Sequence, residues 1–491
     1  MTRTTMNRRR MVILLFAAIV CIALFGAWHV LKPLPAGLDM RGMERPVTAD
    51  RISFLADLTS TDHEGKTVSR QQIFPALFEL IAQAREYILV DIFLFNDQPG
   101  HRSGTPPAPL AGPLVDRLIA RKRQMPGLTV DVITDPINSA YGGAPARELE
   151  RLRAAGINVI VTDLDPLRDS NPLYSTGWRL LLRWIPDIGR FLPHPFAADG
   201  EKVSLNSWLR LINFKANHRK VAVADRNGDL VALVSSANAH GASHDHSNVA
   251  LLVDDSRVAA DIYRSERAVA ELSGGQLRPL PSVDVTNDSN KEGADLSVRV
   301  LTEEQIREAV CTTLKRAGKG DRVRLAMFYL ADRPVIEALL AAGRRGARVE
   351  LILDPNRDAF GYEKNGVPNR PAAAELVEKS AGQIAVRWYL THGEQFHSKL
   401  LLVEYVDGEA TLILGSANFT RRNIGGFNLE TDLLVSGTLA APLFVSMDNY
   451  FNRIWHNFEA EYSCDYSRFA DSSSWKTLQY RIQESTGLGT F

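Results

Sequence analysis

Two short stretches of the 491-residue chain decide its fold: NHRKVAVAD at residues 217–225 and FHSKLLLVE at residues 396–404. Each places a histidine and a lysine two residues apart, so both side chains project from the same face of a β-strand. The apolar run after each lysine predicts that the strand continues into a core. The chain therefore presents an imidazole beside an ammonium group twice.

The same sequence features follow each stretch. Ser-Ala-Asn lies 20 residues after the first histidine and 21 after the second, and a further asparagine follows ten residues later, at Asn248 and Asn428. Two matches at nearly equal offsets are not expected by chance. The candidate catalytic residues are His218, Lys220, Asp225, His397, Lys399 and Glu404. The candidate phosphate-binding residues are Ser236, Asn238, Ser416 and Asn418.

Two such pairs at one site suit phosphodiester chemistry. One neutral histidine attacks phosphorus and forms a phosphohistidine, while the other protonates the leaving oxygen and then activates the incoming hydroxyl group. The lysines and asparagines would hold the non-bridging oxygens. Two lysines neutralise a diester, so we expect no metal ion and no other cofactor. For Asp225 and Glu404, a structural function at a strand end competes equally with a catalytic one.

Around these stretches the chain repeats one pattern of helices and strands. In the first copy, helices are expected at 71–84, 114–123 and 146–155, and strands at 87–95, 128–136 and 157–163. The second copy repeats this order, including strands at 347–355 and 384–390, and Asp-Pro ends a strand in both copies. This alternation predicts α/β layers with helices covering a sheet.

These residues resemble the phospholipase D superfamily, whose mark is H-x-K-x4-D with a downstream G-S/G-x-N, twice per active site. The resemblance covers roughly residues 70–460. It implies two α/β/α sandwich domains related by pseudo-twofold symmetry, with the site at their interface. The sequence departs from this pattern at Glu404, where Asp is usual, and at Ser235, where Gly is usual.

The family often has a carboxylate shortly after the motif, hydrogen-bonded to a catalytic histidine. Glu430 fits that place, and counting from the asparagines makes Ala250 its counterpart in the first half. Only one histidine would then have an orienting acid. Because this acid can reach the histidine of the opposite half in the family, the resemblance favours His218 as nucleophile and His397 as acid.

The N-terminus predicts a membrane anchor. An almost uncharged run at 11–31 follows three arginines and is about 31 Å long as a helix, enough for a hydrocarbon core of about 30 Å. The arginines predict a cytoplasmic N-terminus at 1–10 and a catalytic part on the other side. A cleaved signal peptide is the alternative, but its apolar region is shorter and needs a small-x-small cleavage site.

The first half contains about 40 extra residues, within an insertion at about 165–215. Tryptophan, tyrosine, phenylalanine and arginine alternate with leucine there, which suits either a lipid interface or a flap packed over the mouth of the site. The other boundaries are expected as a linker at 32–69, domain 1 at 70–278, a linker at 279–296, domain 2 at 297–460 and a tail at 461–491.

The expected function is that of a membrane-anchored phosphodiesterase or phosphatidyltransferase acting on phospholipid, of the cardiolipin synthase or phospholipase D type. Arg421-Arg422 would support an exported nuclease instead, but the net charge of zero argues against a duplex-binding protein. A membrane-tethered binding protein with an inactive site is the third possibility. His240, His244 and His246 lack the spacing of a metal site, and the sequence identifies no protein partner.

Overall fold

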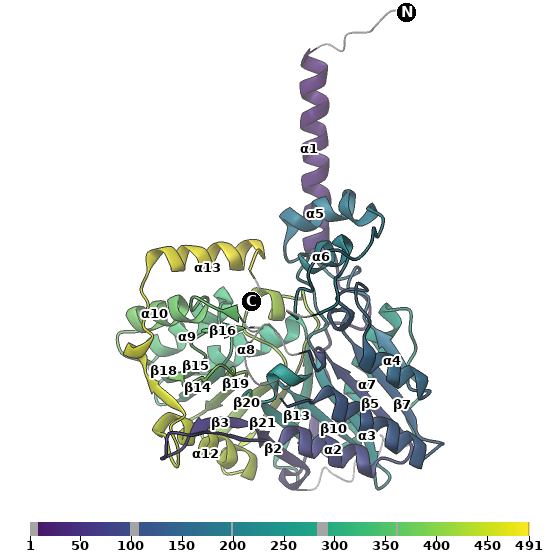
Figure 1. Ribbon diagram of the computed structural model, residues 1–491. Coiled ribbons are helices and arrows are strands. Elements are labelled where there is room, and N and C mark those ends of the chain that lie inside the picture. Colours follow the sequence, from purple (N-terminus) through teal and green to yellow (C-terminus); the bar gives the residue numbers. More distant parts are fainter. Residues whose placement is uncertain (1–7, 99–107, 198–199, 282–292, 360–361, 490) are drawn as a thin grey trace, which may run out of the picture.

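The computed structural model describes residues 8–98, 108–197, 200–281, 293–359, 362–489 and 491. It consists of a mixed α/β body with one long helix, α1 (Arg8–Leu31), standing away from it (Figure 1). Within the described residues, only Arg9–Leu31 is long and apolar enough to cross a membrane, with a mean hydropathy of 2.7. The predicted anchor at 11–31 thus lies in one continuous helix.

The first half forms a seven-stranded sheet in the order β2-β12-β10-β9-β5-β7-β8. Its central strands carry buried aliphatic side chains on both faces, as expected for a sheet covered on both sides. The strands are β2 (Ile52–Ala56), β5 (Tyr87–Ile92), β7 (Thr129–Thr134), β8 (Asn158–Val161), β9 (Lys220–Arg226), β10 (Asp229–Ser235) and β12 (Val249–Val253). The helices around it are α2 (Ile73–Gln83), α3 (Ala111–Gln124), α4 (Arg147–Ala154) and α7 (Ser256–Leu272).

The second half forms a nine-stranded sheet in the order β1-β13-β21-β20-β19-β14-β15-β18-β22. The strands are β1 (Arg45–Val47), β13 (Leu296–Thr302), β14 (Arg322–Met327), β15 (Arg348–Leu353), β18 (Ile384–Tyr389), β19 (Lys399–Glu404), β20 (Glu409–Gly415), β21 (Thr431–Thr438) and β22 (Ser463–Asp465). The helices are α8 (Glu304–Arg316), α9 (Arg333–Arg344), α10 (Asn369–Lys379), α11 (Arg421–Ile424) and α12 (Pro442–His456).

The strand orders of the two sheets agree once the edge strands β1 and β22 are set aside. In both, the strand that follows the histidine (β9 or β19) lies antiparallel to the first strand of its copy (β5 or β14), which pairs in parallel with the next. The expected α/β fold and its repeat are therefore confirmed. A twofold axis between the halves stays a prediction.

One hydrophobic core lies between the halves and contains side chains from both sheets together with α7 and α12. Two further cores lie on the outer faces, one under α2, α3 and α4 and one under α8, α9 and α10. The two sheets thus share a core, and the ends of their strands are held at fixed positions relative to one another.

The segment 32–69, expected as a linker, contributes strands instead. β1 pairs with β13 in the second sheet, and β2 pairs with β12 in the first. A short hairpin, β3 (Leu58–Thr61) with β4 (Thr67–Arg70), follows. This segment therefore ties the two sheets together. The second expected linker, 279–296, lies mostly outside the described residues.

The insertion folds into α5 (Pro172–Leu180), a short 3₁₀ helix at Leu182–Trp184 and α6 (Leu205–Leu211), next to the base of α1 (Figure 1). The tail at 461–491 is also ordered, since β22 joins the second sheet and α13 (Ser474–Thr486) covers the end of that half. Cys311 and Cys464 are free thiols.

Candidate active site

The two halves exchange backbone hydrogen bonds at the start of each motif. The amide of His218 donates to the carbonyl of Leu429 at 2.9 Å, and that of His397 donates to the carbonyl of Ser247 at 2.8 Å. In both cases the segment before the histidine forms a parallel bridge with the other half, Asn217 with Leu429 and Ser247 with Phe396. Each histidine is therefore positioned by the half to which it does not belong.

His218 lies against a buried carboxylate of the second half. Its Nδ1 is 2.9 Å from Oε1 of Glu430, which has no exposed surface. Ser416 and Asn423 also donate to this carboxylate, one to each oxygen. Burial raises the pKa of Glu430 to about 8, whereas Lys220, Ser416 and Asn423 favour its charged form. The charged carboxylate accepts from the ring, which favours the tautomer of His218 with its proton on Nδ1 and the lone pair on Nε2. The predicted orienting residue is therefore in contact with the histidine of the opposite half.

His397 has a neutral partner in the equivalent place. Its Nδ1 is 3.2 Å from Oδ1 of Asn248 in the first half. The hydroxyl of Ser236 donates to the same oxygen at 3.3 Å, and the asparagine amide donates to the carbonyl of His246. One histidine thus faces a carboxylate and the other an amide, so the two do not have equal basicity.

This geometry corrects the assignment of Ala250 as the counterpart of Glu430. Ser236 and Ser416 each accept from the backbone amide after the orienting residue, Val249 and Thr431 respectively, and donate to the residue before it. The counterpart of Glu430 is therefore Asn248. The loop between motif and strand is two residues longer in the second half, so counting from Asn248 and Asn428 gave the wrong register.

The two lysines are almost completely buried beside the histidines. Lys220 donates to the carbonyl of His218 at 2.6 Å, and Lys399 to that of His397 at 2.8 Å. Each ammonium also lies over a phenylalanine ring. The Nζ of Lys220 is 5.2 Å from the ring centre of Phe93, and the Nζ of Lys399 is 5.3 Å from that of Phe328. Each of these rings also contacts the histidine of its motif.

Electrostatic effects cross from each motif to the other. Burial and the charges of Lys220 and Lys399 hold the pKa of His218 well below its usual value. The pKa of His397 is lowered well below its usual value by burial, by Lys399 and His246, and also by Lys220 and His218. Burial lowers the pKa of Lys220 to about 7. Each lysine therefore acts on the histidine of the other half, and the site is poised to take up an anion.

Asp225 and Glu404 lie elsewhere, which corrects the prediction that they are catalytic. Asp225 accepts from the backbone amides of Arg85, Glu86 and Tyr87, at the start of β5, whereas the histidine is level with the far end of that strand. Glu404 ends β19 and lies 3.6 Å from the guanidinium of Arg324. Each acid lies five strand positions after its lysine, which corresponds to about 17 Å. Both residues therefore stabilise the fold.

The four predicted phosphate ligands fall into two groups. The hydroxyls of Ser236 and Ser416 are fully buried and hold Asn248 and Glu430, so the structure gives them a positioning function. Asn238 and Asn418 follow the ends of β10 and β20 and are almost buried. Their contact with phosphate stays a prediction.

Two aspartates position the motifs, although the sequence alone predicted no function for them. Asp135 accepts from the amide of Asn217 at 2.7 Å, and Asp354 accepts from the amide of Phe396 at 2.8 Å. They are the aspartates of the repeated Asp-Pro pairs. Each fixes the backbone immediately before a histidine, and their recurrence at the same place in both copies was the signal for this function.

No cluster of three or more potential metal ligands occurs in the part of the chain that the structure describes. His246 lies with its ring centre 5.9 Å from that of His397, beside the site. His244 is close to Asp245 instead, and His240 to Ser243. Of these three histidines, only His246 therefore lies beside the motif histidines.

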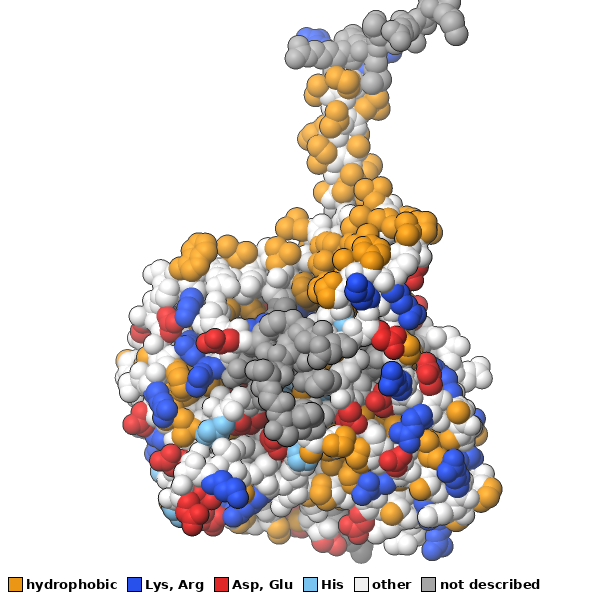
Figure 2. All heavy atoms as spheres, viewed as in Figure 1, with side chains coloured by type: hydrophobic (Ala, Val, Ile, Leu, Met, Phe, Trp, Pro, Cys, Tyr) orange, Lys and Arg blue, Asp and Glu red, His pale blue; other side chains and the backbone are white. Residues whose placement is uncertain are grey.

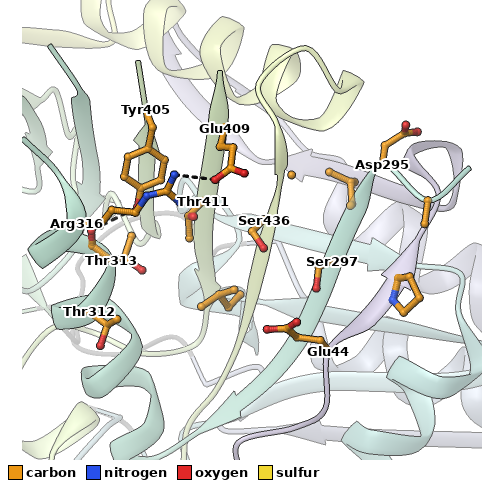
Figure 3. A pocket seen from close by; sticks show the side chains of 15 residues that line it. Glu44, Asp295, Ser297, Thr312, Thr313, Arg316, Tyr405, Glu409, Thr411 and Ser436 are labelled. Carbon is orange, nitrogen blue, oxygen red and sulfur yellow. Dashed lines mark hydrogen bonds and ion pairs between the residues drawn. The ribbon is translucent and has the colours of Figure 1, made fainter. Parts of the chain in front are cut away.

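A hollow of about 740 Å³ lies elsewhere, along the edge formed by β13, β20 and β21 (Figure 3). Its most prominent cation, Arg316, is paired with Glu409 and Asp407 at 2.7 Å each. None of its lining residues belongs to the two motifs. This hollow is therefore separate from the two motifs.

Comparisons with known proteins concern one domain and the overall fold. Residues 310–455 match the family model described as cardiolipin synthase, PLD-like domain. No curated protein sequence matches the chain. The crystal structure of phosphatidylserine synthase from Haemophilus influenzae Rd KW20 superimposes with a TM-score of 0.52 at 15% identity, covering 92% of this chain and 96% of that one.

More distant similarities include polyphosphate kinase from Porphyromonas gingivalis, with a TM-score of 0.42, 16% identity and coverage of 84% of this chain and 52% of that one. Nuc from Salmonella typhimurium, a phospholipase D family member, has a TM-score of 0.26 at 20% identity, with 34% and 97% covered. Residues 310–455 thus match a PLD-like domain, and the chain as a whole shares its fold with the synthase.

Proposed function

We propose that this chain is a membrane-anchored enzyme that transfers or hydrolyses the phosphatidyl group of a phospholipid through a covalent phosphohistidine. The observation that carries the proposal is the reciprocal placement of the two histidine–lysine pairs. Each histidine is held by the other half, and each lysine lowers the pKa of the opposite histidine. Such an arrangement supplies a nucleophile and an acid to one phosphorus atom.

His218 is the nucleophile in this proposal. With its proton on Nδ1, directed at Glu430, its Nε2 attacks phosphorus as the bond to the leaving oxygen breaks. The phosphorylated ring is a cation, which the carboxylate stabilises. His397 gives the proton on its Nε2 to the leaving oxygen, so the alcohol departs neutral. Lys220 and Lys399 offset the charge on the non-bridging oxygens.

The second step reverses the first. The incoming water or alcohol gives its proton to Nε2 of His397, its oxygen attacks phosphorus, and the phosphorus–nitrogen bond to His218 breaks. The buried histidines and lysines have low pKa values without an anion. A bound phosphodiester favours their protonated forms, so the acid is charged when substrate is present.

Phospholipid is the proposed substrate class because the apolar helix α1 adjoins the aromatic insertion, and the matched domain model and the structural neighbour bear lipid-synthase names. The side of the membrane follows from the arginines at 8–10, which favour a cytoplasmic N-terminus and place the catalytic part outside. Arg422, which would have supported a nuclease groove, is buried and donates to the carbonyls of Gly487 and Gly489 at 2.7 Å.

The proposal is tested with the purified full chain in lipid nanodiscs, given labelled phosphatidylglycerol or, separately, labelled single-stranded and duplex DNA. We expect turnover of the lipid and none of the DNA. His218→Ala and His397→Ala report contaminating activity, and adding an alcohol such as glycerol separates transfer from hydrolysis. Turnover of DNA without lipid turnover would establish the nuclease alternative. No turnover of either by a folded chain would favour the binding-protein alternative.

A further inference from the structure

The C-terminal helix α13 exposes the apolar side of its surface and buries polar groups. Trp475 is 72% exposed, and Leu478 and Ile482 are also exposed. Spacings of three and four residues place these three on one helix face. On the opposite side, the hydroxyl of Tyr480 donates to Glu375 at 3.1 Å, and Glu484 accepts from the amide of Arg421 at 2.6 Å. An outward apolar face of this kind marks an interaction surface.

The insertion presents a second apolar surface beside it. Leu173, Leu181, Trp184, Ile188 and Phe191 are all more than half exposed. Figure 2 shows hydrophobic side chains gathered over the ends of both lobes, on the side from which α1 emerges. Figure 1 places α13 on the second half and α5 on the first half, and both lie on the side from which α1 emerges. The two apolar surfaces therefore lie on the same side of the molecule.

The two surfaces are also joined directly. The end of α13 packs on the start of the insertion so closely that a Cβ at Gly487 would lie 2.0 Å from the carbonyl oxygen of Ser170. Arg422 links them, since it donates to Gly487 and also to the hydroxyl of Ser170 at 3.3 Å. The same short helix, α11, carries Asn423, which holds Glu430. The joined surface thus lies next to the reaction centre.

The length of α1 indicates that the lipid bilayer covers these apolar surfaces. Its last turns are not free to span a membrane, because Gly26 packs against Thr176 of α5 and the carbonyl of His29 accepts from the amide of Asp169 at 2.9 Å. The free part, from residue 9 to residue 25, is about 25 Å long as a helix. A hydrocarbon core of about 30 Å is thicker than this. Entry of the apolar part of the insertion into the bilayer would make up the difference.

We propose that α13 and the insertion together rest in the interface of the bilayer that α1 spans, and so hold the mouth of the active site against the lipid. The anchor alone would let the body turn about one attachment. A second contact on the other lobe fixes its orientation. Tryptophan on α13 and on the insertion suits the headgroup level. This proposal requires α1 to be a membrane span, but does not require any particular reaction at the site.

The experiment uses the full chain in liposomes. Cys21, Cys311 and Cys464 are replaced by alanine, and a single cysteine is placed at Leu478→Cys or Trp184→Cys and labelled with a polarity-sensitive fluorophore. The matched control is Val406→Cys, an equally exposed apolar position in the turn between β19 and β20. The turn lies just before β20, and Asn418 lies just after β20. The control is therefore at the end of the second half opposite to its motif asparagine.

We expect lipids carrying a quencher near the headgroup to quench the labels at 478 and 184 at least threefold more than the label at 406. The proposal is overturned if the label at 478 is quenched no more than the control. It is also overturned if that label is shielded without lipid quenching and the chains cross-link as dimers, because a second copy would then cover the helix. Quenching is independent of turnover, so failure here leaves the proposed reaction untouched.

Discussion

Replacing Glu430 by glutamine removes the charge that faces His218 and keeps the shape of the side chain. In the native site, the carboxylate accepts from Nδ1 at 2.9 Å and has no exposed surface. A glutamine can present its amide to the ring instead. The ring proton then moves to Nε2, the atom that attacks phosphorus, and the nucleophile is lost.

The magnitude follows from the partners. A hydrogen bond to a charged group contributes about 1.5–3 kcal/mol, which is about 10- to 150-fold in rate. The wrong tautomer adds to this, so we expect kcat to fall about 10²- to 10³-fold. The matched control is Asn248→Ala at the equivalent position of the other half. It removes a neutral hydrogen bond of about 0.5–1.5 kcal/mol, so we expect a fall of about tenfold or less.

The assay is single-turnover formation of the lipid–enzyme adduct, measured with phosphatidylglycerol in nanodiscs over a range of pH. Thermal unfolding of each variant shows whether it is folded. We expect Glu430→Gln to slow adduct formation far more than Asn248→Ala does. Equal losses in the two variants, or a larger loss in Asn248→Ala, would refute the assignment of His218 as the nucleophile.

Three further predictions concern stability and protonation. Asp225→Asn lowers the melting temperature by about 5 °C, because three backbone amides lose a charged acceptor. It leaves kcat per folded molecule unchanged. An unchanged melting temperature with a reduced kcat would show instead that Asp225 takes part in the reaction. Burial raises the pKa of Asp432 to about 8, so the native state keeps a proton that the unfolded chain loses near pH 4. The free energy of unfolding therefore decreases as the pH rises from about 4 to 8. Asp432→Asn therefore gains stability relative to the native chain over that range in denaturation experiments, and a pH-independent difference would contradict the shift. Binding of inorganic phosphate near pH 7.5 takes up on the order of one proton per site. Calorimetry in buffers of different ionisation enthalpy measures this uptake. Release of protons would contradict the lowered pKa values of the histidines and lysines.

The histidines and lysines were predictable from the sequence because a period of two in a strand fixes which side chains share a face. The expected helices and strands of both copies also occur at nearly the expected places, since each is a long apolar pattern with clear ends. These features depend on local sequence. The α/β class and the position of both motifs at strand starts follow from them directly.

What the sequence could not provide depends on contacts between distant segments. The counterpart of Glu430 was misplaced by two residues because loop length, and not residue type, sets the register there. The segment at 32–69 forms strands only because both sheets offer it an open edge. Nothing local marks the backbone amides that Asp225 holds, and the outward apolar face of α13 shows only when its buried side is known.

The most direct test is to trap the adduct and identify its residue. The full chain in nanodiscs is mixed with phosphatidylglycerol, quenched within milliseconds in alkaline denaturant, where phosphohistidine survives, and digested for mass spectrometry. We predict a phosphatidyl group on His218, still formed when His397 is replaced by alanine and the leaving group is activated, and absent in His218→Ala. An adduct on His397, or turnover without any adduct on either ring, would contradict the account.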